Sequence, residues 1–159
     1  MNEKCNVAFN AANQARIKNE LPVGCAVFIN GVIFCTEHNR TNQYKDPLAH
    51  CEFLAINYLK SVDLRILNIH SCEFYITLEP CVMCYGILIE LKNDILKYFP
   101  QAKFVVYFGV HNYIFGMTQV LPSYLDGTLE YICLNNYKAV NIVKEFYLCN
   151  RNAKINYNS

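Results

Sequence analysis

The sequence predicts an α/β fold in which helices cover a central mixed sheet. A predicted β-hairpin is followed by helices and strands that alternate along the chain, which is the pattern of a layered α/β domain. Hydrophobic residues make up 53% of the 159 positions and charged residues 17%, so the chain can form one apolar core and is not a disordered tail. We therefore expect a single domain over residues 1–159.

The first half of the chain predicts a helix, a hairpin and a second helix. Leu21–Gly24 contains a proline and a glycine that end the first helix, and Asn30-Gly31 is a strong signal for a two-residue hairpin turn. After a polar loop, Asp46-Pro47 is typical of a helix start. The expected elements are a helix over 5–18, strands over 25–29 and 32–35, and a helix over 48–60.

The second half alternates between strands and helices. Glu79-Pro80 ends a strand, and Pro100 ends the long helix that follows it. The β-rich apolar run before Gly109 predicts a buried strand. The expected elements are strands over 73–78, 103–108 and 130–134, and helices over 81–98 and 138–149.

Composition limits where the protein works and what it binds. No charged-then-apolar signal segment opens the sequence, and no apolar run approaches the ~18–20 residues of a membrane span. We expect an intracellular, reducing location, cytoplasmic or nuclear, in which the nine cysteines form no disulfide framework. The net charge of +1 is smaller than the basic excess that is typical of a protein that binds nucleic acid without a partner.

Two short segments carry the residue types of a metal site, and both lie where a helix is predicted to begin. One contains Cys81 and Cys84 in a CxxC pattern, and a helix N-terminus favours the thiolate form of such residues. The other contributes His50. Catalytic zinc sites use three protein ligands and leave a fourth position for water, whereas structural sites close with four. With no second CxxC in the chain, the sequence predicts a catalytic zinc site with these three ligands.

Glu52 is the candidate acid–base residue of this site. A carboxylate near a zinc-activated water can take its proton and return it to a leaving amine. Because residues two apart do not face each other within a regular helix, we expect the metal to lie off the helix end, near its first turn. Alone, the CxxC also matches a thioredoxin-like redox motif, and His50 alone is typical of a structural histidine. Their combination with Glu52 favours the metal site.

The same residues resemble the zinc-dependent nucleobase deaminases, whose signature is H-x-E followed by P-C-x-x-C. Further segments are similar to tRNA adenosine deaminases. The segments after residue 100 are similar in particular to the catalytic subunits of the eukaryotic enzymes. The resemblance covers nearly the whole chain and implies a three-layer α/β/α sandwich with a central mixed five-stranded sheet. The segments that carry it are Leu21–Gly24, His38–Arg40, Asp46–Glu52, Thr77–Cys84, Val105–Gly109, Asn112–Gly116 and Lys144–Tyr147.

This resemblance implies zinc-dependent hydrolysis of adenosine to inosine at the wobble position, position 34, of tRNA anticodons. Zinc on the three predicted ligands would activate water, and Glu52 would carry protons to the ring nitrogen and to the departing ammonia. Asn39 matches the family's residue that contacts the flipped base or its ribose. Backbone around Val23, Gly24 and Ala49 would shape the pocket floor.

The resemblance also implies partners. The substrate would be a tRNA anticodon stem-loop, and the chain would pair with a non-catalytic, deaminase-like subunit that lacks the carboxylate of Glu52. A heterodimer is favoured over a homodimer. Because a net charge of +1 provides little electrostatic attraction for RNA, the partner would supply much of the RNA binding. Tyr113 is one candidate for stacking on a base.

The chain departs from the family at two places, and two other functions stay open. Cys51 stands where the family usually has alanine, and residues from about Glu90 to Pro100 look longer than the usual connection. One alternative is a deaminase of a free nucleoside, nucleotide or base, of the cytidine or guanine type. The other is a non-catalytic pseudo-deaminase partner, which the presence of Glu52 disfavours.

Overall fold

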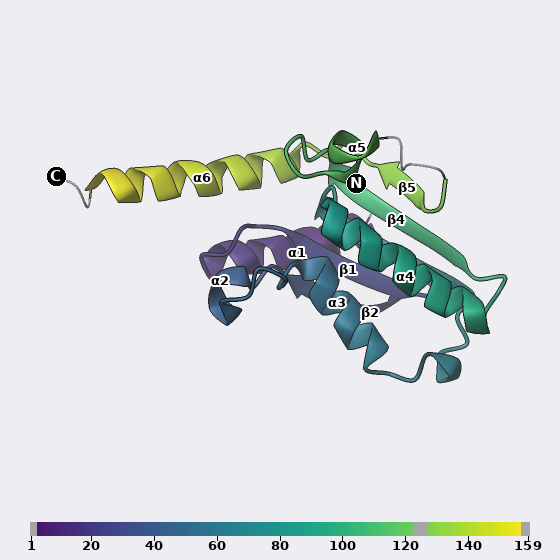
Figure 1. Cartoon of the computed structure of the whole chain (residues 1–159). Coiled ribbons are helices and arrows are strands. Elements are labelled where there is room, and N and C mark those ends of the chain that lie inside the picture. Colours follow the sequence, from purple (N-terminus) through teal and green to yellow (C-terminus); the bar gives the residue numbers. More distant parts are fainter. Residues whose placement is uncertain (1–2, 123–126, 157–159) are drawn as a thin grey trace.

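A five-stranded mixed sheet forms the centre of the computed structural model, which describes residues 3–122 and 127–156 (Figure 1). The strands are β1 (Gly24–Ile29), β2 (Val32–His38), β3 (Ser71–Leu78), β4 (Lys103–Val110) and β5 (Glu130–Cys133). The helices are α1 (Glu3–Ile17), α2 (Thr41–Tyr44), α3 (Cys51–Lys60), η1 (Leu64–Ile66), α4 (Val82–Tyr98), α5 (Met117–Val120) and α6 (Lys138–Asn156).

The sheet combines an antiparallel and a parallel half. Its order is β2-β1-β3-β4-β5, with β1 antiparallel to both β2 and β3, and with β3, β4 and β5 mutually parallel. The hairpin turn between β1 and β2 uses Asn30 and Gly31, both with positive φ, as the right-handed twist of a two-residue hairpin requires. The parallel half places the carboxyl ends of β3 and β4 at one edge, where α/β proteins commonly bind ligands.

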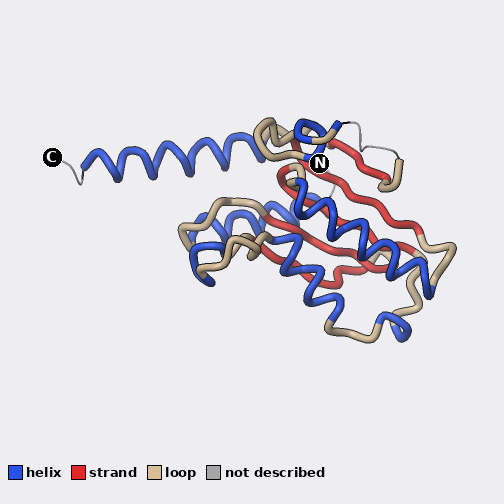
Figure 2. The backbone as a smooth tube through the Cα atoms, in the orientation of Figure 1, coloured by secondary structure: helices blue, strands red, loops and turns tan. Residues whose placement is uncertain are grey.

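Helices cover both faces of the sheet. Helices α3 and α4 pack side by side on one face, over the larger apolar core (Figure 1). Helix α1 packs on the other face through a row of buried alanines, and there Gly24 permits the close approach because a Cβ would collide with the backbone of Ala8 and Ala12. Helix α6 contacts β3 and β4 and forms an ion pair with α1 between Glu145 and Arg16, and Figure 2 shows its C-terminal part projecting beyond the other elements. The predicted three-layer α/β/α architecture with a five-stranded mixed sheet is confirmed.

Local differences from the predicted elements have local causes. Helix α3 begins at Cys51 instead of Leu48, because the backbone N–H of Leu48 donates to the Asp46 side chain and forms a turn instead. The short helix α2 occupies the segment predicted as a polar loop, and α5 occupies a segment for which no element was predicted. The apparent extension at Glu90–Pro100 is a continuation of α4, which runs unbroken to Tyr98. Within the described ranges, no helix is long and apolar enough to cross a membrane.

Candidate active site

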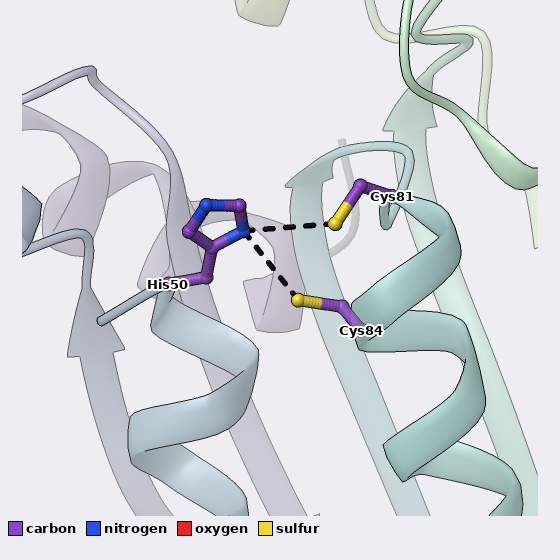
Figure 3. Close-up of side chains that lie close together, drawn as sticks. All are labelled: His50, Cys81 and Cys84. Atoms are coloured by element: carbon purple, nitrogen blue, oxygen red, sulfur yellow. Dashed lines mark hydrogen bonds between the residues drawn. The ribbon is translucent and has the colours of Figure 1, made fainter. Parts of the chain in front are cut away.

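Three potential metal ligands meet between the N-terminal ends of α3 and α4. His50 Nδ1 lies 3.7 Å from Cys81 Sγ and 3.6 Å from Cys84 Sγ, and all three ligand atoms lie within 4.8 Å of one another. Figure 3 shows the imidazole of His50, just before α3, pointing toward the sulfurs of Cys81 and Cys84 at the start of α4. Among the described residues, this is the one group of three or more histidine, cysteine or acidic side chains placed to hold a metal ion.

The helix ends explain this geometry and its electrostatics. His50 is the N-cap of α3 and Cys81 the N-cap of α4, so both lie at the positive end of a helix dipole. Hydrogen bonds from the Cys84 thiol and from the His50 imidazole lower the pKa of Cys81 to about 4. The Cys81 sulfur is therefore a thiolate at neutral pH, which is the form that binds metals.

The spacing of these ligand atoms fits zinc. With Zn–S bonds of about 2.3 Å and Zn–N bonds of about 2.0–2.1 Å at tetrahedral angles, a sulfur and a nitrogen ligand lie about 3.6 Å apart. The two observed distances, 3.6 and 3.7 Å, match this value. One imidazole and two thiolates also leave one tetrahedral position for water, as in catalytic zinc sites.

Glu52 reaches the same pocket from the first turn of α3. The spacing of two residues from His50 is no obstacle, because His50 has extended backbone angles (φ −73°, ψ 150°) and lies outside the regular helix. The Glu52 carboxylate is 3% exposed and lines one cavity of about 350 Å³ together with His50 and Cys81. Burial raises its pKa, and a carboxyl group with a raised pKa is suited to give and take protons near neutral pH.

Two of the four residues predicted to contact substrate, Asn39 and Val23, line this cavity. The Asn39 Oδ1 accepts a hydrogen bond from the backbone N–H of Cys51 over 2.9 Å, and buried His38 donates to the Asn39 carbonyl through Nδ1. Gly24 and Ala49 are not among the lining residues: Gly24 faces α1, and Ala49 is buried with its carbonyl bound to the N–H of Arg40. Substrate contact by any of the four stays a prediction.

Sequence reasoning missed Glu79, which builds one wall of the cavity. Its side chain is fully buried and accepts hydrogen bonds from the backbone N–H groups of Asn112 (2.9 Å) and Thr118 (2.8 Å) and from His111 Nδ1 (3.2 Å). These bonds hold the loop after β4, so that Asn112 and Phe115 also line the cavity. A glutamate directly before a Pro-Cys ligand segment was the available signal, but its partners lie more than 30 residues further along the chain.

Residues 2–99 match the family model of the cytidine and deoxycytidylate deaminase zinc-binding region. The chain belongs to this deaminase family. The match contains all three converging ligands and Glu52, so family membership and geometry agree that the protein binds zinc through His50, Cys81 and Cys84. The predicted zinc cofactor is thereby confirmed.

Curated relatives of this deaminase include tRNA-specific adenosine deaminases. The protein of Aquifex aeolicus is 42% identical over 94 residues, which cover 57% of this chain and 60% of the relative's length. The tRNA-specific adenosine deaminase 2 of Xenopus laevis is 29% identical over 157 aligned positions, which cover 88% of this chain and 82% of the relative. The corresponding protein of Danio rerio is 30% identical, and the match covers 88% of this chain and 67% of the relative.

Solved structures share the deaminase fold. A structure from studies of A-to-I editing by tRNA:A34 deaminases superposes with a TM-score of 0.67 at 21% identity, covering 87% of this chain and 97% of that one. The guanine deaminase of Nitrosomonas europaea superposes with a TM-score of 0.72 at 18% identity, covering 92% and 84%. Both establish the fold of this deaminase.

Proposed function

We propose that this deaminase converts adenosine to inosine at the wobble position, position 34, of tRNA anticodons, as the catalytic subunit of a heterodimer. The observation that carries the proposal is the buried Glu52 carboxylate in one cavity with the zinc ligands His50 and Cys81. The similarity to tRNA-specific adenosine deaminase 2 over 88% of the chain supports adenosine in tRNA as the substrate.

The reaction consumes water and releases ammonia, so that the adenine carbon exchanges its amino group for oxygen. A bound zinc ion lets water act as a nucleophile near pH 7. Glu52 takes a proton from this water and passes it to the ring nitrogen, and a second transfer completes the departing ammonia. Because burial raises the pKa of Glu52, the carboxyl group can hold each proton between these transfers.

Asn39 is a hydrogen-bond donor to the substrate in this scheme. Its Oδ1 is already bound by the N–H of Cys51, so the amide NH₂ group is the part left to bind the base or its ribose. Val23 lines the same cavity and supplies apolar contact to the base. Together they orient the flipped adenosine toward Glu52.

The surface beside the cavity suits an RNA loop. A second cavity of about 400 Å³ shares Leu21, Leu78, Asn112 and Phe115 with the first, and its rim includes the 78% exposed Tyr113. Unpaired bases of RNA stack on such aromatic side chains. This continuity favours a polynucleotide over a free nucleoside, and a tRNA substrate would place the protein inside the cell.

A partner subunit completes the proposal. The net charge of +1 provides few cations for a polyanion, so we infer that a second, deaminase-like chain lacking the Glu52 carboxylate contributes much of the RNA binding. Tight tRNA binding by the isolated chain at physiological salt would contradict this division of labour.

The test compares the zinc-loaded chain alone and coexpressed with such a deaminase-like chain, on an anticodon stem-loop with adenosine at position 34. We expect inosine at that position with the wild type and at least about 10²-fold less with Glu52→Gln, which keeps the side-chain size. Ammonia release from free adenosine, cytidine and guanine is measured in parallel. Deamination of a free base or nucleoside with an unchanged stem-loop would refute the proposal, and equal turnover by Glu52→Gln would refute the role of Glu52.

A further inference from the structure

Cys51 contacts two polar residues of the catalytic cavity, Asn39 and Glu52. It is the first residue of α3 and is 0% exposed. Its backbone N–H donates to Asn39 Oδ1 over 2.9 Å, and its Sγ lies 3.1 Å from Glu52 Oε2. One buried residue therefore connects the expected substrate-binding amide to the expected proton carrier.

The direction of the second contact follows from the groups involved. A carboxylate oxygen only accepts hydrogen bonds, so the Cys51 thiol donates to Glu52. The terminal torsion of a glutamate side chain is broad, and without a partner the two carboxylate oxygens of Glu52 could turn freely. The Cys51 thiol donates to one of these oxygens and restricts that rotation.

The Cys51 sulfur is not a competing metal ligand. The converging ligand atoms come from His50, Cys81 and Cys84, whereas the Cys51 side chain is engaged with Glu52.

We propose that Cys51 is a positioning residue for the deamination. Its thiol holds one carboxylate oxygen of Glu52 and leaves the other oxygen to exchange protons with water and substrate. This inference rests on the proposed function, because it requires Glu52 to be the proton carrier. Since Cys51 is fully buried, solvent does not readily replace a lost thiol donor, and the carboxylate of an alanine variant would spend less time in the reactive orientation.

Three variants of the zinc-loaded chain, each coexpressed with the deaminase-like partner, test the proposal kinetically on the position-34 stem-loop. Cys51→Ala removes the donor, Cys51→Ser restores one, and Cys72→Ala is the matched control because Cys72 is equally buried in the core but lies on β3. We expect Cys51→Ala to lower kcat about fivefold with KM and zinc content unchanged, and Cys51→Ser to regain most of the loss. The control should keep the wild-type kcat.

A Cys51→Ala variant with a kcat within about twofold of the wild type would overturn the proposal. So would a Cys51→Ser variant as slow as Cys51→Ala, because packing and not the donor would then matter. A wild type that leaves the stem-loop unchanged would instead refute the proposed function, which makes the two failures distinguishable.

Infrared spectroscopy supplies a readout that needs no activity. The S–H stretching band that disappears in Cys51→Ser belongs to Cys51, and donation to a carboxylate lowers its frequency. We expect this band to move to higher frequency in Glu52→Gln, because a neutral amide is a weaker acceptor. An identical band in the wild type and in Glu52→Gln would show that the thiol does not donate to Glu52 and would refute the inference.

Discussion

Replacing Glu79 with glutamine is expected to loosen the loop that closes the catalytic cavity. The carboxylate accepts three hydrogen bonds: Oε2 from the N–H of Asn112 and from His111, and Oε1 from the N–H of Thr118. Glutamine has nearly the same size but only one acceptor oxygen, so its NH₂ group must face at least one of these donors. One backbone N–H then loses its acceptor, and the remaining bonds lose their negative charge.

The expected cost is about 2 kcal/mol, since an unsatisfied buried donor costs about 1–3 kcal/mol and charge-assisted bonds weaken when the acceptor is neutral. For a chain of this length the melting temperature should fall by roughly 4–8 °C. Urea denaturation and thermal melts measure both quantities. Glu130→Gln, which alters an exposed ion pair with Lys103, is the control and should change stability by less than about 0.5 kcal/mol. A Glu79→Gln variant as stable as this control would refute the reasoning.

Three further predictions concern packing, titration and metal binding. Gly24→Ala should destabilise the fold by at least about 2 kcal/mol in urea denaturation, because its Cβ would collide with the backbone of α1, whereas Gly86→Ala meets open space in α4 and should be neutral or stabilising. Burial raises the pKa of the Cys35 thiol to about 12, whereas the thiol of the unfolded chain loses its proton above about pH 8.5. The free energy of unfolding should therefore fall as the pH rises from about 8.5 toward 12. Cys35→Ala should reduce the stability lost between pH 7 and 10 by roughly 1–2 kcal/mol. Cys84→Ser should lower bound zinc from about one ion per chain to well below that in elemental analysis, while Cys133→Ser, outside the ligand cluster, should retain it.

The zinc site was predictable from the sequence because its determinants are local. Cys81 and Cys84 lie in one helical turn after a proline, and a helix start places both sulfurs at the same end whatever the rest of the fold does. His50 and Glu52 likewise share one helix start. The alternation of apolar strands and helices was equally local, which is why the predicted layers were confirmed.

Sequence reasoning did not find the contacts that orient these groups. Glu79 binds a loop more than 30 residues away, and the Asn39 amide meets the N–H of Cys51 only because the end of β2 lies beside the start of α3. These contacts depend on the register of the sheet and on how a helix packs against it. Neither can be deduced from the spacing of residues along the chain.

The sequence by itself determined the layered fold and the three zinc ligands and predicted Glu52 as the proton carrier, because each follows from residue types at short spacing within a segment. Only the tertiary structure decided that Glu79 holds the cavity wall and that the Cys51 thiol donates to Glu52 instead of joining the metal ligands. The reason is physical: a side chain at a helix start can turn toward several neighbours, and only packing selects which one it contacts.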